Sequence, residues 1–422
     1  MLKCICDNKI YILGGITMKN VVKEELKNEV ETYNVAPDGG NTEIKVIYNG
    51  EYTTYDNIYA KDSHIDYNTM NLSEDDMDEY LEDILNVKFT YHAGQEDCKV
   101  QEFLFGNLAT NNKSDLEERT NGDKSADEML VMTSILSSVN FIIDRMEPNQ
   151  IKKEMVMKLN VSTGLPYHEY SIDNKREMYE QHFLGQHIIE FLDPRYPVEK
   201  VTLNIENVIV NSEGMSALKT EIEINQVLNE ETMEDLINTV WCMIDIGGYS
   251  TDIIGGIWRR KRSGLKLETI DSLSIGLKYG IATAQDEAIK TIFKEYHTNY
   301  GKLPATFKIT RKDINDAEMR TKNKGLLNNR YKTNTLDYTI EEYKKIARRI
   351  ANDFAQKYIV NSQMDSILKI YLSGGGAKNE ILVEILKEEL ENRGINKEFV
   401  ECVTIPDPVY VNAYSYYLQF DK

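Results

Sequence analysis

Three short segments combine glycine with acidic, hydroxyl or lysine side chains, which is what a phosphate-binding turn needs. They read Asp38-Gly-Gly-Asn-Thr-Glu-Ile-Lys45, Asp245-Ile-Gly-Gly-Tyr-Ser-Thr-Asp252 and Tyr371-Leu-Ser-Gly-Gly-Gly-Ala-Lys-Asn-Glu380. Glycine lets the backbone turn tightly, and it lets N–H groups approach an anion without a Cβ in the way. The first two segments are therefore candidate phosphate-binding turns, and the third could admit a flat ring or a phosphate close to the backbone.

The charged side chains of the first two segments suggest separate roles. A carboxylate such as Asp38 or Asp245 does not bind phosphate directly, but it can hold a hydrated Mg²⁺ ion. Lys45 adds a positive charge one short strand after the first turn. Each of these segments taken alone also fits an ordinary hairpin turn, since Asp-Gly and Gly-Gly are common between paired strands.

Strands and helices around these segments would bring them to the edges of two sheets. Apolar runs predict a strand and its return on either side of each of the first two turns, and a strand at 367–372 that leads through glycines into a helix. The N-terminus of such a helix favours negative charge. The chain therefore contains two similar halves in which strands alternate with helices, and it belongs to the α/β class.

Length and charge limit the possible functions. A chain of 422 residues is expected to form two domains. A formal net charge of −20 repels phosphate backbones and anionic lipids, so we expect neither direct DNA binding nor membrane binding. No apolar run approaches the length of a bilayer span, and the five scattered cysteines suit a reducing cytoplasm.

The order and spacing of the three segments resemble those of the actin-like ATPase superfamily. Within it, the chain looks most like the ParM group of plasmid-partition actins. Thr163-Gly-Leu-Pro-Tyr167 matches a signature of that group, and the stretches at 274–288, 307–316 and 408–418 fall in the family's order. The resemblance covers about 33–422. No Walker-type or Rossmann glycine motif is present in the sequence, so those two nucleotide-binding classes are disfavoured.

This resemblance implies an actin-like fold, in which two RNase H-like domains, each subdividable, surround a central nucleotide cleft. The implied division is an N-terminal extension at 1–32, domain I at 33–239 and domain II at 240–404. A C-terminal helix at 405–422 would return to domain I. The implied ligands are ATP (or GTP) and Mg²⁺.

The resemblance also assigns site residues. Family logic places Glu213, after a strand of the first domain, as the residue that orients the attacking water, helped by Asp245; Glu213 could equally be an ordinary residue of a helix's first turn. Asp38 and Asp245 would hold Mg²⁺ through water. The residues expected to contact the nucleotide are Gly39, Gly40, Asn41, Thr42, Lys45, Gly247, Gly248, Tyr249, Ser250, Gly276, Gly374, Gly375, Gly376 and Lys378.

Several segments depart from the family pattern or lack a predicted role. Gly39 stands where many relatives have a second aspartate, and Tyr249 replaces a common threonine. The segment 51–86, with an acidic run at 73–83, is longer or more divergent than expected and could form a filament surface or a solvated helix. The polar stretch 107–124 predicts a surface loop, and 276–298 predicts a helix.

The function implied is a cytoplasmic ATPase that polymerises head to tail into filaments and moves plasmid DNA through a separate DNA-binding adaptor of the ParR type. Two alternatives stay open at this point. One is a sugar-kinase-like or acetate-kinase-like phosphotransferase of the same superfold, which would need a dedicated acceptor pocket. The other is a scaffold that does not hydrolyse nucleotide.

Overall fold

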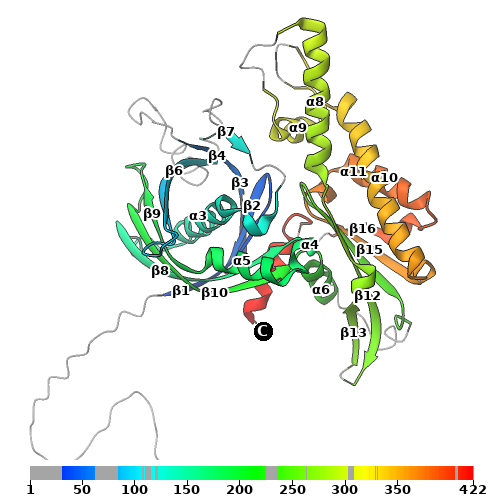
Figure 1. The fold of residues 1–422 in the computed structure, drawn as a ribbon, viewed down its shortest axis with the longest axis horizontal. Helices are drawn as coiled ribbons and strands as arrows, with labels where there is room; N and C mark the ends of the chain where they lie inside the picture. Colours follow the sequence, from blue (N-terminus) through cyan, green and yellow to red (C-terminus); the bar gives the residue numbers. More distant parts are fainter. Residues whose placement is uncertain are drawn as a thin grey trace, which may run out of the picture.

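The computed structural model describes residues 31–61, 84–106, 109, 116–118, 122–224, 235–262, 264–302, 308–327, 329, 331–403 and 407–421. The N-terminal extension up to residue 30 and the acidic run at 73–83 lie outside these ranges. Figure 1 shows two sheets side by side, each with its own helices. Every helix among the described residues is too short or too polar to span a bilayer.

The first sheet contains ten strands of the described residues, in the order β3-β2-β1-β8-β10-β9-β5-β6-β4-β7. Its centre is parallel, because β1 pairs with β8 and β8 with β10 in the same direction. We call this sheet and its helices the first lobe. Its strands are β1 (Thr32–Gly39), β2 (Glu43–Tyr48), β3 (Glu51–Asp56), β4 (Ile58–Lys61), β5 (Ile84–Tyr91), β6 (Lys99–Gly106), β7 (Leu116–Glu118), β8 (Glu154–Leu165), β9 (Gly185–Phe191) and β10 (Lys200–Ser212).

Helix α3 (Glu128–Asp144) forms the centre of the first core. Its side chains from Leu130 to Ile143 are all buried, including the polar ones of Thr133, Ser134, Ser137, Ser138 and Asn140. Asp127 caps the helix by accepting a hydrogen bond from the backbone N–H of Leu130 at 2.9 Å. In Figure 1 the sheet curves around this helix. The remaining helices of this part are α4 (Tyr167–Tyr170) and α5 (Asp173–Phe183).

The second sheet contains six strands of the described residues, in the order β13-β12-β11-β15-β16, with β14 paired to β12. Residues of its strands form one buried core with residues of α10 and α11. We call this sheet and its helices the second lobe. Its elements are β11 (Val240–Ile246), β12 (Thr251–Lys261), β13 (Gly264–Thr269), β14 (Ile275–Leu277), α8 (Ile281–Tyr300), α9 (Arg311–Glu318), α10 (Leu336–Val360), β15 (Ile367–Ser373), α11 (Glu380–Glu391) and β16 (Val400–Cys402).

Two helices pack away from their neighbours in the sequence. Helix α6 (Met215–Ile224) follows the last strand of the first sheet, but its buried residues cluster with Met243 and Ile254 of the second. Helix α12 (Val411–Tyr417), near the C-terminus, packs through Ala413 and Tyr416 on the first sheet. The chain therefore crosses between the lobes more than once, and the domain boundary at 239/240 stays a prediction.

The predicted helix at 276–298 begins later than expected. Residues 275–277 form strand β14, which pairs with β12, and helix α8 begins at Ile281. The apolar pattern of this segment is compatible with either structure, so the pairing with β12 decides where the helix can start. Lys124, the last residue of the predicted loop at 107–124, is buried and belongs to the cavity described below.

Candidate functional site

The first glycine turn connects β1 to β2. Asp38 and Lys45 face each other across this hairpin, and both side chains are buried. The N–H of Gly40 donates to the carbonyl of Glu43 at 2.8 Å, which closes the turn. A Cβ on Gly40 would lie 2.6 Å from that same carbonyl oxygen, so this position requires glycine.

The second glycine turn connects β11 to β12 and mirrors the first. In this turn the N–H of Gly247 donates to the carbonyl of Ser250 at 2.9 Å. The carbonyls of Gly247 and Gly248 accept from the N–H groups of Ile281 and Ala282 at 3.0 and 2.8 Å. The turn is therefore fixed by the first residues of α8, whose N–H groups would otherwise have no partner within the helix.

Asp245, just before the second turn, is held by two distant residues. Its Oδ1 accepts from the hydroxyl of Ser373 at 2.9 Å, and its Oδ2 accepts from the amide Nδ2 of Asn412 at 2.7 Å. The other amide atom of Asn412, Oδ1, accepts from the N–H of Gly214 at 3.2 Å. Asn412 therefore fixes Asp245 and the turn that carries Glu213 at the same time.

The third glycine turn follows β15. Gly374 has a φ of 80°, which favours glycine, and a Cβ there would lie 2.5 Å from Oδ1 of Asp245. A short 3₁₀ turn at Gly375–Lys378 separates it from α11. The side chain of Asn379 caps α11 by accepting from the N–H of Leu382 at 3.0 Å.

All three turns line a single cavity of about 260 Å³ between the two lobes, close to the lower end of small-molecule sites. The first two turns approach each other so closely that a Cβ on Gly248 would lie 2.7 Å from Nδ2 of Asn41. The predicted residues that line the cavity are Asp38, Gly40, Asn41, Thr42, Lys45, Glu213, Asp245, Gly247, Gly248, Ser250, Gly374, Gly375 and Lys378.

Four predicted residues do not line this cavity. A Cβ on Gly39 would meet α3, one on Gly376 would meet Ile246, and one on Gly276 would meet the backbone of His168. The hydroxyl of Tyr249 contacts the Asp286 carboxylate and accepts from Nη1 of Arg311 at 2.8 Å. Tyr249 therefore links the second turn to α8 and α9.

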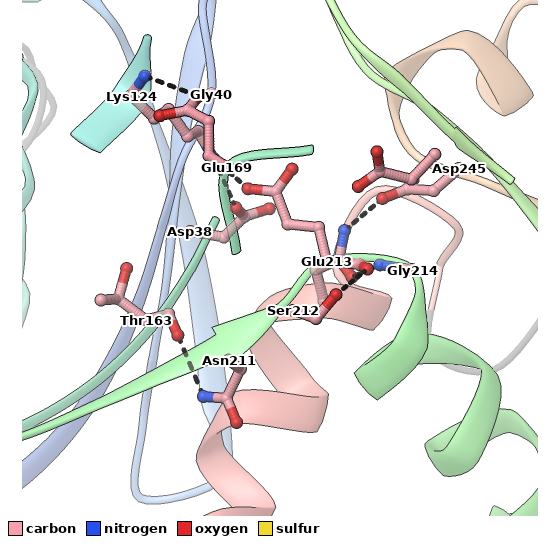
Figure 2. A network of polar contacts seen from close by, with 12 residues as sticks. Asp38, Gly40, Lys124, Thr163, Glu169, Asn211, Ser212, Glu213, Gly214 and Asp245 are labelled. Atoms are coloured by element: carbon pink, nitrogen blue, oxygen red, sulfur yellow. Dashed lines mark hydrogen bonds and ion pairs between the residues drawn. The ribbon is translucent and has the colours of Figure 1, made fainter. Parts of the chain in front are cut away.

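Lys124 is the main residue of the cavity that the sequence analysis missed. It belongs to a short 3₁₀ turn, η2 (Lys124–Ala126), and is 6% exposed, although the polar stretch around it predicted a surface loop. Its Nζ contacts Glu213 and lies 3.5 Å from Oδ1 of Asp38. Figure 2 shows Asp38, Lys124, Glu213 and Asp245 converging from separate segments. The prediction of a surface loop fails at Lys124 because two carboxylates from distant segments pair with this lysine.

Burial and charge together raise the pKa values of Glu213, Asp245 and Lys124. Burial raises the pKa of Glu213, and the negative charges of Asp38 and Asp245 add to this, while Lys124 opposes it. Burial raises the pKa of Asp245 against hydrogen bonds from Asn412 and Ser373. Burial alone would lower the pKa of Lys124, but the charges of Glu213 and Asp38 outweigh it and raise this pKa.

A polar network lines the cavity on the side of α9, and the sequence analysis missed it as well. Glu318 is buried and accepts from the hydroxyls of Thr339 and Tyr343 at 2.7 and 2.9 Å and from Nδ2 of Asn379 at 2.8 Å. Gln285 donates to Asn315 at 2.6 Å. In the sequence analysis the stretch 307–316 contributed only to the family resemblance, and it predicted none of these contacts.

The donors of the cavity fit a magnesium–nucleotide. Glycine turns from both lobes line the cavity, and a Cβ on Gly40 or Gly248 would collide with Glu43 or Asn41. Three buried carboxylates, Asp38, Glu213 and Asp245, share this cavity with Lys45 and Lys124. A divalent cation would reduce the repulsion among them, and carboxylate oxygens are the ligands that Mg²⁺ prefers.

The comparisons with known proteins agree with this geometry. No protein-family model matches the chain, and no curated protein matches it. Among solved structures, a 15-stranded ParM filament from Clostridium botulinum is similar at 20% identity, with 92% of this chain and 98% of that chain covered and a TM-score of 0.62. The archaeal actin homolog Ta0583 is similar at 15% identity, with 92% and 99% covered and a TM-score of 0.62.

A third similar structure is Bacillus thuringiensis ParM with ATP, at 17% identity, with 92% of this chain and 98% of that chain covered and a TM-score of 0.54. These similarities extend over nearly the whole of each chain. They confirm the predicted α/β fold of the actin-like type with its two sheets. At these identities they establish the fold, while function depends on the residues of the site.

Proposed function

We propose, from the actin-like fold and the cavity between its lobes, that this chain is a nucleoside triphosphatase that polymerises head to tail into filaments. One observation carries the proposal: glycine turns from both sheets line the same cavity, together with Lys45, Lys124 and the buried carboxylates of Asp38, Glu213 and Asp245. The backbone N–H groups and the two ammonium groups can bind phosphate oxygens, and the carboxylates can hold an accompanying divalent cation through water. ATP or GTP with Mg²⁺ supplies both the phosphates and the cation.

In the proposed mechanism, backbone N–H groups of the two turns and the ammonium groups of Lys45 and Lys124 bind the phosphates. Bound Mg²⁺ would neutralise charge on the phosphates, and Asp38 and Asp245 would hold it through water. Glu213 orients a water molecule and accepts its proton, because its carboxylate lines the cavity. Asn412 fixes the turn that carries Glu213.

Nucleotide would couple to filament assembly because it contacts both lobes. A ligand that binds one relative position of the lobes better than others shifts the chain toward that position. Head-to-tail contacts between identical subunits then give open helical filaments. The proposed role is plasmid segregation in the cytoplasm through a separate adaptor of the ParR type, and it is supported by the family resemblance and by the net charge of −20.

Light scattering and phosphate release, followed together, test this function. With purified protein, Mg²⁺ and ATP or GTP, we expect scattering to rise and then fall as phosphate is released. With a non-hydrolysable analogue such as AMPPNP, scattering should rise and stay high. Phosphate release without any scattering would contradict filament assembly, and transfer of phosphate to an added sugar or acetate would favour a phosphotransferase.

A further inference from the structure

Helix α4 joins the two lobes beside the candidate site. It directly follows β8 of the first lobe through the Thr163–Tyr167 signature. The backbone N–H of its first residue, Tyr167, donates to Oδ2 of Asp252 on β12 at 2.6 Å. The hydroxyl of Tyr167 donates to Asp271 at 3.1 Å. This short helix is therefore continuous with one lobe and hydrogen-bonded to the other.

Glu169, the third residue of α4, is 1% exposed and binds the turn that carries Lys124. Its Oε1 accepts from the N–H of Lys124 at 2.9 Å. Its Oε2 accepts from the N–H of Ser125 at 2.9 Å and from the hydroxyl of Ser125 at 2.6 Å. Hydrogen bonds to an ionised acceptor are stronger than those between neutral groups. This carboxylate therefore fixes the backbone from which the side chain of Lys124 reaches the cavity.

The contacts form a continuous path from the second lobe to the proposed catalytic carboxylate. Asp252 binds the N–H of Tyr167, Glu169 on the same helix turn binds η2, and the Nζ of Lys124 contacts Glu213. Glu169 itself does not line the cavity, so it can act on a nucleotide only through Lys124. Figure 2 shows the last three residues of this path, Glu169, Lys124 and Glu213.

We propose that Glu169 is a positioning residue that places the ammonium of Lys124 for the terminal phosphate, and that the Thr163–Tyr167 signature sets α4 for this role. The inference rests on the proposed function, because it assumes that a nucleotide occupies the cavity. It adds that recognition of the third phosphate depends on a carboxylate outside the cavity. A glutamine at this position would turn an amide donor toward N–H donors, and η2 would shift.

The test measures nucleotide binding rather than turnover. Isothermal titration calorimetry gives the dissociation constants of Mg–ADP and Mg–AMPPNP. The constant for Mg–ADP divided by that for Mg–AMPPNP defines the preference for the triphosphate. We expect Lys124→Met and Glu169→Gln each to lower this ratio roughly tenfold, since each removes or misplaces one charged contact. The double variant should lower it no further, because the two residues act as one unit.

Two further variants complete the design. Glu177→Gln, on the exposed face of α5, is the matched control and should leave the ratio unchanged. Ser125→Ala removes one of the three donors to Glu169, so we expect a smaller decrease of about threefold, in proportion to one lost hydrogen bond. This variant decides the question if Glu169→Gln does not fold.

The outcomes separate the two proposals. If the unsubstituted chain binds neither nucleotide, the proposed function fails. If it prefers the triphosphate and only Lys124→Met lowers the preference, the proposed function stands and the role of Glu169 is wrong. A Glu169→Gln variant that loses stability but keeps the ratio would show that this carboxylate only supports the fold.

Discussion

Glu213→Gln should release phosphate roughly 100-fold more slowly than the unsubstituted chain, while it still binds nucleotide and assembles. Glutamine keeps the size of the side chain but cannot accept a proton from water, and proton transfer by a positioned group contributes about two to four orders of magnitude in rate. Glu213 contacts Lys124 and lines the cavity. The measurement is phosphate release in single turnover, with light scattering recorded in parallel.

Scattering should then rise as before but fall much more slowly, because disassembly follows hydrolysis. Glu206→Gln is the matched control: it lies on the same strand, β10, and its side chain is 68% exposed. This control should behave like the unsubstituted chain. Unchanged phosphate release in Glu213→Gln would remove Glu213 from the mechanism and leave the nucleotide-binding proposal intact.

Gly280→Ala should weaken nucleotide binding roughly tenfold, although Gly280 is not one of the residues lining the cavity. Its Cβ would lie 2.2 Å from the carbonyl oxygen of Gly247, 2.7 Å from that of Gly248 and 2.8 Å from that of Ser250. All three are backbone atoms, so the second turn must move. Overpacking of this kind typically costs about 1–3 kcal/mol, and each 1.4 kcal/mol of binding free energy is about tenfold.

Calorimetric titration with Mg–ADP and urea unfolding measure the two effects of Gly280→Ala, on affinity and on the free energy of unfolding. Gly122→Ala is the control, because a Cβ there has no atom within 4 Å. We expect this control to change neither quantity. Nucleotide binding by Gly280→Ala as tight as that of the unsubstituted chain would show that the second turn does not hold the phosphates.

The main elements of the fold are predictable because their signals are local. Alternating or continuous apolar residues, ended by glycine or proline, place β2 at Glu43–Tyr48 and β11 at Val240–Ile246 as predicted. The predicted start of α8, at residue 276, was wrong because residues 275–277 pair with β12, which is not adjacent to them in the sequence. Local pattern alone does not distinguish that strand from the first turn of a helix.

The candidate site also contains residues that local sequence patterns predict and residues that they do not. Its glycine turns are visible in the sequence because glycine and aspartate stand together at strand ends. The roles of Lys124 and Glu169 are not visible in the sequence, because their partners are distant in it. Lys124 contacts Glu213, 89 residues away. Glu169 accepts from Lys124 and Ser125, which lie 45 and 44 residues away. A buried lysine in a polar stretch has the same local signal as an exposed one, and only the fold brings the carboxylates to it.

A structure of the chain with Mg²⁺ and AMPPNP tests most directly whether the two hairpin turns hold one nucleotide together. We predict that the phosphates lie between Gly40–Thr42 of the first lobe and Gly247–Ser250 of the second, with the ammonium of Lys124 beside the terminal phosphate. Phosphates that contact only one of the two turns, or a nucleotide bound outside this cavity, would contradict the proposed function.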